Sequence, residues 1–103
     1  QLPEDAARFV LREVLSGLED IHRRGWMHRD VKAENIGISK PLDSADFPRS
    51  CSIKILDFDS AVVLPTNRRL TEVIGTVENM APEVFDGSYD ESADCWSLGV
   101  VAY

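Results

Sequence analysis

A polar loop from His28 to Asn35 places an acid, a cation and an amide close together in the sequence. Asp30 offers a carboxylate that can accept a proton, Lys32 offers a cation for developing negative charge, and Asn35 offers an amide oxygen for a metal ion. Taken singly, each of these residues is explained as well by a solvated polar loop. Their combination beside the apolar run from Ile36 to Ile38 favours a catalytic site.

A further acidic residue, Asp57, directly follows the apolar run from Ser52 to Leu56. A carboxylate at the end of a rigid strand can hold a hard cation such as Mg²⁺, and the amide oxygen of Asn35 can share that ion. An isolated aspartate after a strand is usually a turn residue. Its pairing with the earlier loop favours a metal site.

The apolar pattern predicts the elements that position these residues. From Pro3 to Arg24, apolar side chains recur at steps of three and four residues, which is typical of an amphipathic helix. Gly25 is placed for a left-handed cap at the end of that helix. Ile36 to Ile38 and Ser52 to Leu56 are predicted as short strands. Lys40 to Cys51, between them, is rich in turn-forming residues and is predicted as a surface loop.

The second half of the chain is less regular. From Asp57 to Glu83 no periodicity holds, and a long segment without regular structure is more often functional than not. A short helix is predicted for Pro82 to Phe85 and a turn for Gly87 to Asp90. A second helix is predicted to begin near Glu91 to Ala93. It is expected to enter the core through Trp96, Leu98, Val100 and Val101.

Composition limits the class of protein. The 103 residues fit one compact domain or part of a larger one, and 44% hydrophobic with 28% charged residues is typical of soluble globular domains. The net charge of −7 argues against a nucleic-acid surface. It is compatible with basic peptide substrates, although an acidic, well-solvated surface explains it equally well. No apolar stretch approaches the roughly 20 residues that cross a bilayer.

The cysteines and the chain ends give two further expectations. Cys51 and Cys95 form neither a metal-binding pair nor a disulfide-dense pattern, so we expect reduced thiols in a cytoplasmic or nuclear protein. The chain begins at Gln1 and stops at Tyr103 inside an apolar run, without a cap or turn signal. Both ends are expected to be cuts within a longer domain.

The motifs, in their order, resemble the signature set of the protein kinases. They are His28-Arg29-Asp30-Val31-Lys32-Ala33-Glu34-Asn35 for the catalytic loop, Asp57-Phe58-Asp59 for the metal-binding motif, Ala81-Pro82-Glu83 for the end of the activation segment, and Asp94-Cys95-Trp96-Ser97-Leu98-Gly99 for the central helix. The resemblance covers essentially the whole chain. It implies an α+β fold in which residues 1–103 form part of a protein kinase domain, the mostly helical C-lobe with two or more short strands.

The resemblance also implies an activity, ATP-dependent transfer of a phosphoryl group to protein substrates with Mg²⁺. Asp30 is expected to accept the proton of the substrate hydroxyl, and Lys32 to contact the transferred group. Asn35 and Asp57 are expected to hold Mg²⁺ against the phosphates of ATP. Lys32 and the pair Gly75-Thr76 are similar to the serine/threonine kinases, in which Thr76 would bridge Asp30 and Lys32. The helix from Asp94 onward is similar to the calmodulin-dependent group.

Further roles follow from the same resemblance. His28 and Phe58 are expected to pack together in the active state, and Asp94 to accept hydrogen bonds from the backbone of the catalytic loop. Glu72 occupies the place where many related kinases carry a phosphorylated threonine, so it is expected to pair with Arg29 as a permanent substitute for phosphate; Thr71 is the competing candidate for a phosphorylated switch. The residues assigned to substrate binding or regulation are Arg29, Glu34, Glu72 and Thr76.

Two departures from the family pattern keep an alternative open. Asp59 replaces the usual glycine, and although aspartate visits left-handed conformations better than most residues, it adds a carboxylate near the metal. Gly37 replaces a large apolar residue that lies under the adenine ring. The alternative is a pseudokinase that acts as a binding or scaffolding module; an unrelated α/β domain is a remote third reading. The glycine-rich loop and the strand lysine have no counterpart in the sequence, so the fragment alone is expected to be inactive.

Overall fold

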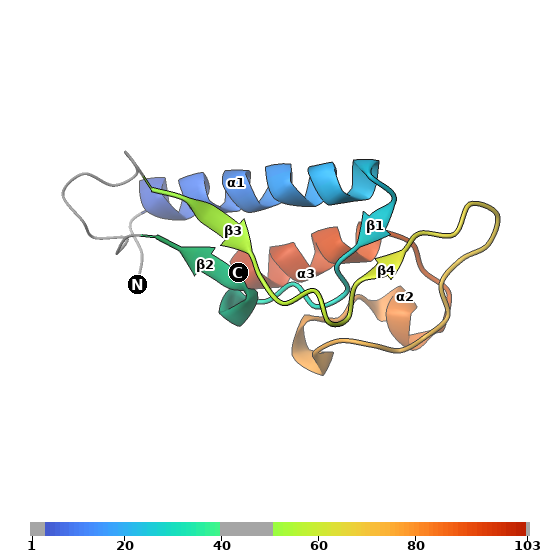
Figure 1. Cartoon of the computed structure of the whole chain (residues 1–103). Coiled ribbons are helices and arrows are strands. Elements are labelled where there is room, and N and C mark those ends of the chain that lie inside the picture. The colour runs from blue at the N-terminus through green and yellow to red at the C-terminus, as the bar shows by residue number, and fades with distance from the viewer. Residues whose placement is uncertain (1–3, 40–50, 103) are drawn as a thin grey trace.

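The computed structural model describes residues 4–39 and 51–102 of the chain. A long helix, α1 (Glu4–Arg23), runs along the molecule, and the other elements lie to one side of it (Figure 1). β2 (Ile36–Ile38) and β3 (Ile53–Ile55) lie near the N-terminal end of α1, and β1 (Trp26–Met27) and β4 (Val62–Val63) near its C-terminal end. Helices combined with two antiparallel strand pairs confirm the predicted α+β class.

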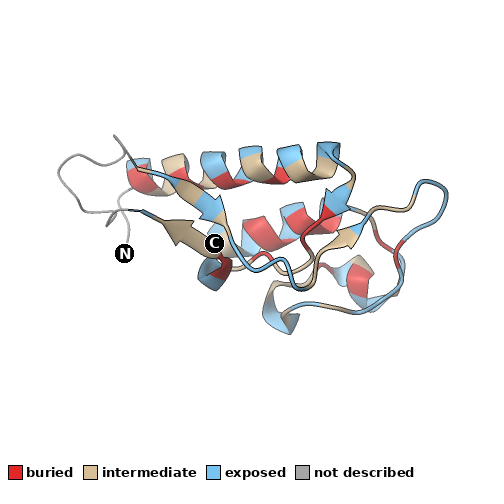
Figure 2. Ribbon diagram, in the orientation of Figure 1, coloured by how far each residue is buried: buried red, intermediate tan, exposed pale blue. Residues whose placement is uncertain are grey.

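Helix α1 confirms the helix predicted from the apolar repeat, although the predicted start at Pro3 lies outside the described residues. Gly25 follows the helix with a φ of 87° and donates its N–H to the His22 carbonyl at 3.0 Å, as a left-handed cap requires. Gly17 faces β3, and a Cβ there would lie 3.0 Å from Cδ1 of Ile55, so this glycine permits close packing. The buried residues of α1, on the side turned toward α3 and the strands (Figure 2), are Ala6, Val10, Val14 and Leu18.

The two predicted strands pair with each other. β2 and β3 are antiparallel, with Ile36 opposite Ile55 and Ile38 opposite Ile53. The predicted surface loop between them lies outside the described residues except for Cys51. Because Asn35 precedes β2 directly and Leu56 follows β3 directly, this hairpin brings the catalytic loop beside the metal-binding motif.

The second strand pair is not predicted by the sequence. β1 and β4 are antiparallel, with Met27 opposite Val62. Together with a 3-10 helix at Val77–Asn79, β4 corrects the expectation that no regular structure occurs between Asp57 and Glu83. Another 3-10 helix, Ala33–Asn35, lies within the polar loop.

Two further helices complete the fold. α2 (Pro82–Phe85) confirms the predicted short helix, and α3 (Ser92–Ala102) begins where the second helix is predicted. The predicted core face of α3 is wrong for Trp96 and Val100, which are 50% and 37% exposed. α3 is apolar on most sides, so hydrophobicity does not identify the face that packs. Its buried residues are Ala93, Asp94, Ser97 and Leu98.

The catalytic loop lies between two hydrophobic clusters. Met27 belongs to the cluster around Tyr89, whereas Val31 belongs to the cluster beneath α1 that contains Leu18. Met27 and Val31 are 1% and 2% exposed, so the backbone is anchored on both sides of the residues between them. Within the described ranges, no helix is both long enough and apolar enough to cross a membrane.

Candidate active site

A buried carboxylate on α3 holds the backbone of the catalytic loop. Asp94 is 1% exposed, and it accepts the backbone N–H groups of His28 and Arg29, each at 2.9 Å. His22, on α1, donates from Nε2 to the same carboxylate at 2.8 Å. A buried carboxylate that receives several hydrogen bonds is stabilised and rigid. The expected contact between Asp94 and the loop backbone is therefore present, and His22 adds a support that the sequence does not predict.

His28 connects the loop to the metal-binding motif. The backbone N–H of Asp30 donates to Nδ1 of His28 at 3.1 Å, so Nδ1 is the acceptor and Nε2 carries the proton. Nε2 then donates to the carbonyl of Leu56 at 2.8 Å. The His28 ring also meets Phe58 edge-on, with ring centroids 5.0 Å apart at 67°. This is the predicted His28 and Phe58 contact, although Phe58 remains 46% exposed.

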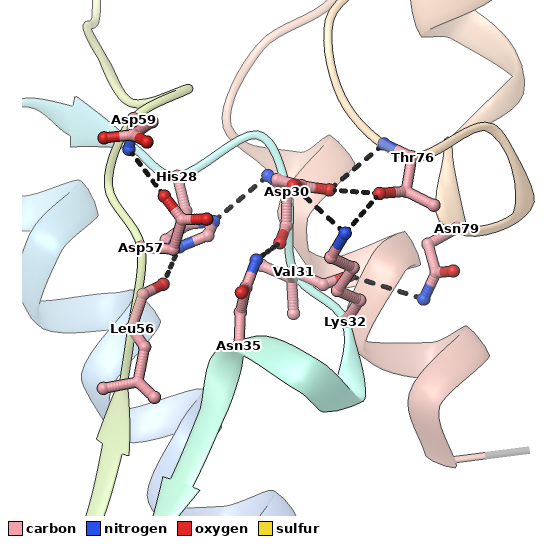
Figure 3. A network of polar contacts seen from close by, with 10 residues as sticks. All are labelled: His28, Asp30, Val31, Lys32, Asn35, Leu56, Asp57, Asp59, Thr76 and Asn79. Atoms are coloured by element: carbon pink, nitrogen blue, oxygen red, sulfur yellow. Dashed lines mark hydrogen bonds and ion pairs between the residues drawn. The ribbon is translucent and has the colours of Figure 1, made fainter.

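Asp30, Thr76 and Lys32 form a closed triangle of polar contacts (Figure 3). The hydroxyl of Thr76 donates to Oδ1 of Asp30 at 2.7 Å, and the backbone N–H of Thr76 donates to the same oxygen at 3.1 Å. Nζ of Lys32 donates to the Thr76 hydroxyl at 3.0 Å and lies 3.7 Å from Oδ2 of Asp30. Thr76 thus bridges Asp30 and Lys32 as the resemblance implies, and Oδ1 of Asp30 is the fully engaged oxygen.

Asn35 and Asp57 lie on the side of Asp30 away from Thr76 (Figure 3). The amide nitrogen of Asn35 donates to the carbonyl of Asp30 at 2.8 Å, which orients the side chain so that its oxygen could serve as a metal ligand. Asp57 has a φ of 58° and an exposed side chain. Left-handed backbone at a non-glycine residue concentrates at functional sites.

The donor set of this face fits Mg²⁺ held jointly with phosphate oxygens. Mg²⁺ takes oxygen ligands and is usually bound by one or two protein groups, with substrate phosphates and water completing the shell. Asn35 and Asp57 supply two such oxygens. Among the described residues no cluster of three histidine, cysteine, aspartate or glutamate side chains could hold an ion alone. Two protein oxygens suit an ion whose other ligands are phosphate oxygens and water.

Asp59 does not adopt the left-handed backbone conformation that glycine allows more easily than other residues. Within the described residues, positive φ outside glycine occurs at Arg29 and Asp57, so Asp59 needs no left-handed conformation. Its N–H donates to Oδ1 of Asp57 at 3.2 Å, and its own carboxylate is exposed. The replacement of glycine by Asp59 therefore adds negative charge near Asp57 and does not require a strained backbone at position 59.

Arg29 ties the catalytic loop to the activation segment. Its Nη1 donates to Oε1 of Glu72 at 3.2 Å and to the hydroxyl of Tyr89 at 3.3 Å, and its Nε donates to the carbonyl of Ser60 at 2.7 Å. The Tyr89 hydroxyl in turn donates to the Glu72 carbonyl. The structure brings Arg29 and Glu72 together as predicted, whereas Glu34 lies exposed on its 3-10 helix.

Tyr89 and His22 are the site residues that sequence reasoning misses. Tyr89 is 0% exposed and forms an antiparallel bridge with Leu70, which holds the chain two residues before Glu72. The sequence offers no signal for the contact between His22 and its partner Asp94 on α3. Partial burial, followed by the nearby carboxylates, raises the pKa of the Cys95 thiol, which disfavours its reactive thiolate form.

Comparison with known proteins agrees with this geometry. The protein kinase domain family matches residues 1–103, and the chain belongs to that family. It is 37% identical over 103 residues to the human serine/threonine-protein kinase ULK1, covering 99% of this chain. It is 38% identical over 99 residues to calcium-dependent protein kinase 4 of Plasmodium berghei, and 38% identical over 111 residues to citron Rho-interacting kinase of Mus musculus, covering 96% and 100% of this chain.

The match spans only a small part of each relative. The chain corresponds to 10% of the human kinase, 18% of the Plasmodium kinase and 5% of the mouse kinase. All three relatives carry the word kinase in their names.

Proposed function

We propose that this chain is part of the catalytic domain of a serine/threonine kinase that transfers a phosphoryl group from ATP to hydroxyl groups of protein substrates. The observation that carries the proposal is the triangle of Asp30, Thr76 and Lys32 beside the oxygen ligands of Asn35 and Asp57. Phosphoryl transfer depends on positioning and on electrostatic stabilisation. A carboxylate, a cationic side chain and a pair of oxygen groups suited to a metal ion lie within one small region and can meet both needs.

Asp30 is the proton acceptor in this proposal. Its Oδ1 is engaged by Thr76, which leaves Oδ2 for the substrate hydroxyl. The hydroxyl oxygen forms a bond to the terminal phosphorus, the hydroxyl proton passes to Asp30, and the bond from that phosphorus to the bridging oxygen breaks as ADP leaves. Lys32, with a side chain 28% exposed, can reach both Asp30 and the transferred group and offset its negative charge.

Asn35 and Asp57 would hold Mg²⁺ in this proposal, and a bound ion would supply positive charge to offset the phosphates of ATP. The remaining residues position these groups: Asp94 holds the loop backbone and Arg29 holds the activation segment through Glu72. A glutamate carries one negative charge where phosphate carries about 1.5 to 2. We infer that Glu72 supplies a weaker but permanent ordering of the segment without phosphorylation.

The proposal concerns a longer protein. The sequence contains no glycine-rich phosphate loop, and the residues described supply one side of a nucleotide cleft. Residues 1–103 are therefore a partial domain that requires the rest of its lobe and a second lobe for activity. The described thiols Cys51 and Cys95 are free, which supports a cytoplasmic or nuclear address.

A pseudokinase is the second candidate, and Gly37 and Asp59 are the observations that favour it. The parent protein assayed with radiolabelled ATP and a mixture of peptides containing serine, threonine or tyrosine separates the two. Mg²⁺-dependent labelling of serine or threonine peptides is expected, and Asp30→Asn is expected to abolish it because the amide keeps the shape but cannot accept the proton. Unchanged labelling in Asp30→Asn would remove the kinase assignment, and nucleotide binding without any labelling by the unaltered protein would support the pseudokinase.

A further inference from the structure

One stretch of the activation segment is paired with the turn that follows α2. The backbone N–H of Leu70 donates to the carbonyl of Tyr89 at 2.9 Å, and the N–H of Tyr89 donates to the carbonyl of Leu70 at 3.0 Å. The two residues are 5% and 0% exposed and belong to the same hydrophobic cluster as Val84 of α2. A reciprocal pair of backbone hydrogen bonds within a buried cluster holds the chain at position 70 without any charge.

The neighbouring residue, Arg69, adds contacts on the exposed side of this pair. Its Nε donates to the hydroxyl of Ser88 at 2.8 Å, and its Nη2 donates to the carbonyl of Ser88 at 3.1 Å. Its Nη1 lies 3.5 Å from Oδ2 of Asp90. One guanidinium therefore contacts the residues on both sides of Tyr89. Because the Arg69 side chain is 52% exposed, its ion pair with Asp90 is expected to stabilise the attachment only weakly.

The hydroxyl of Tyr89 joins the activation segment to the catalytic loop. It donates to the backbone carbonyl of Glu72 and accepts a hydrogen bond from Nη1 of Arg29 at 3.3 Å. Arg29 directly precedes Asp30 in the chain. Glu72 lies four residues before Thr76, whose hydroxyl donates to Asp30 at 2.7 Å. One buried hydroxyl thus contacts both of the chain segments that meet at the hydrogen bond between Thr76 and Asp30.

We propose that Tyr89 is a positioning residue for phosphoryl transfer, because its hydroxyl holds the backbone of Glu72 against the catalytic loop. In this way Tyr89 keeps Thr76 in contact with Asp30. The inference rests on the proposed function. The hydrogen bond uses the carbonyl of Glu72, so it does not depend on the charge of the Glu72 side chain. Salt screens the ion pair between Arg29 and Glu72, whereas a buried bond between uncharged groups persists.

Tyr89→Phe tests the role of the hydroxyl, because it keeps the buried ring. In the unphosphorylated parent protein we expect kcat for peptide phosphorylation to fall about tenfold, the effect of leaving buried polar groups without a partner. The KM for ATP should change little, because the displaced groups are Thr76 and Asp30. The loss of turnover should persist at high ionic strength and should recur when Tyr89→Phe is combined with Glu72→Gln. Ser92→Ala, which removes a hydroxyl that donates to Asp90 at 2.6 Å, is the matched control and should keep normal turnover.

Limited digestion with trypsin gives a second measurement that does not depend on activity. Arg68 is exposed and lies two residues before the buried Leu70. If Tyr89 holds this stretch, Tyr89→Phe should speed cleavage after Arg68 about fivefold through local opening. Cleavage after Arg23, an exposed residue at the end of α1, should keep its rate. A general loss of stability would accelerate cleavage at both sites, and mass spectrometry of the fragments separates the two cases.

Equal acceleration at Arg68 and Arg23 would overturn the inference, as would full turnover in Tyr89→Phe or a loss of turnover that disappears at high salt. If thermal melting shows that Tyr89→Phe does not fold, Arg69→Gln tests the same attachment at an exposed side chain. It should also speed cleavage after Arg68, and unchanged cleavage would count against the inference. Absence of peptide phosphorylation by the unaltered parent protein would overturn the proposed function itself, whereas the digestion separately decides whether Tyr89 holds the segment.

Discussion

Arg29 and Glu72 form an ion pair between the catalytic loop and the activation segment, with Nη1 of Arg29 3.2 Å from Oε1 of Glu72. The Arg29 side chain is 8% exposed, whereas Glu72 is 68% exposed. The buried guanidinium of Arg29 also donates hydrogen bonds to the Ser60 carbonyl and the Tyr89 hydroxyl. Without the Glu72 carboxylate, its positive charge would be poorly compensated. We therefore expect Glu72 to stabilise the ordered segment without any modification.

Glu72→Gln tests this relationship in the parent kinase before phosphorylation. The amide keeps the size of the side chain but removes the charge, and we expect turnover to fall about fivefold, the effect of roughly 1 kcal/mol for a partly exposed ion pair. Raising the ionic strength should shrink the difference between variant and unaltered protein, because salt screens the pair. Initial rates on one peptide substrate at two salt concentrations measure both effects.

The controls for Glu72→Gln separate it from the neighbouring threonine. Thr71→Ala should leave the activity of unphosphorylated protein unchanged, and Glu13→Gln, on the exposed side of α1, should do the same. Full activity in Glu72→Gln, with loss confined to Thr71→Ala after treatment with an upstream kinase, would contradict the role of Glu72. In that case Thr71 is the switch and Glu72 is solvated loop charge.

The second prediction concerns the extra carboxylate of Asp59. Asp59→Gly keeps the N–H that donates to Asp57 at 3.2 Å and removes an exposed negative charge. We expect a modest increase in turnover or in nucleotide affinity, about two- to threefold, as the metal ligand Asp57 regains the freedom and the local charge typical of the family. Asp57→Ala is the reference variant, and it should lose Mg²⁺-dependent nucleotide binding.

A Mg²⁺ titration of nucleotide binding distinguishes the outcomes for Asp59. Higher nucleotide affinity or turnover in Asp59→Gly would show that Asp59 weakens metal binding or restricts the motion of the Asp57-Phe58-Asp59 motif. An unchanged titration and unchanged turnover would show that Asp59 is tolerated, which removes much of the case for a pseudokinase. Normal Mg²⁺-dependent binding in Asp57→Ala would remove Asp57 from the metal site.

The parts of the fold that the sequence predicts are those with a local signal. The apolar repeat of α1 and the short apolar runs of β2 and β3 each lie within one continuous segment of the sequence, and each is confirmed. The pairing of β1 with β4 is different, because a two-residue strand has no period and its partner is far along the chain. The buried face of α3 is also undetermined, since apolar residues surround that helix.

The candidate site divides in the same way. The chemical groups Asp30, Lys32 and Asn35 are recognised from type and spacing, because the chemistry requires those residue types near one another. The residues that position these groups are not recognised from the sequence, because their partners are distant in the chain. His22 contacts Asp94, 72 residues away, and Tyr89 contacts Arg29, 60 residues away. A histidine on a helix or a tyrosine in a loop carries no local signal of such a contact.

The last prediction follows from Gly75, which directly precedes Thr76. Gly75 has a φ of 123°, and a Cβ there would lie 2.5 Å from the carbonyl oxygen of Arg29. Because that oxygen belongs to the backbone of the catalytic loop, Gly75→Ala must move one of the two segments. The hydrogen bonds from Thr76 to Asp30, at 2.7 and 3.1 Å, would lengthen or break. We expect turnover in the parent kinase to fall at least tenfold, since a displacement of about 1 Å can cost a hundredfold.

Gly25→Ala is the matched control, because it places the same side chain at another glycine of positive φ. Gly25 has a φ of 87° but no atom within 4 Å of the added Cβ, so we expect only the backbone cost of about 1 kcal/mol and little change in turnover. Thermal melting and peptide phosphorylation are measured on both variants. Normal turnover in Gly75→Ala, or equal losses of turnover in the two variants, would mean that close contact between Gly75 and Arg29 does not hold Thr76 against Asp30.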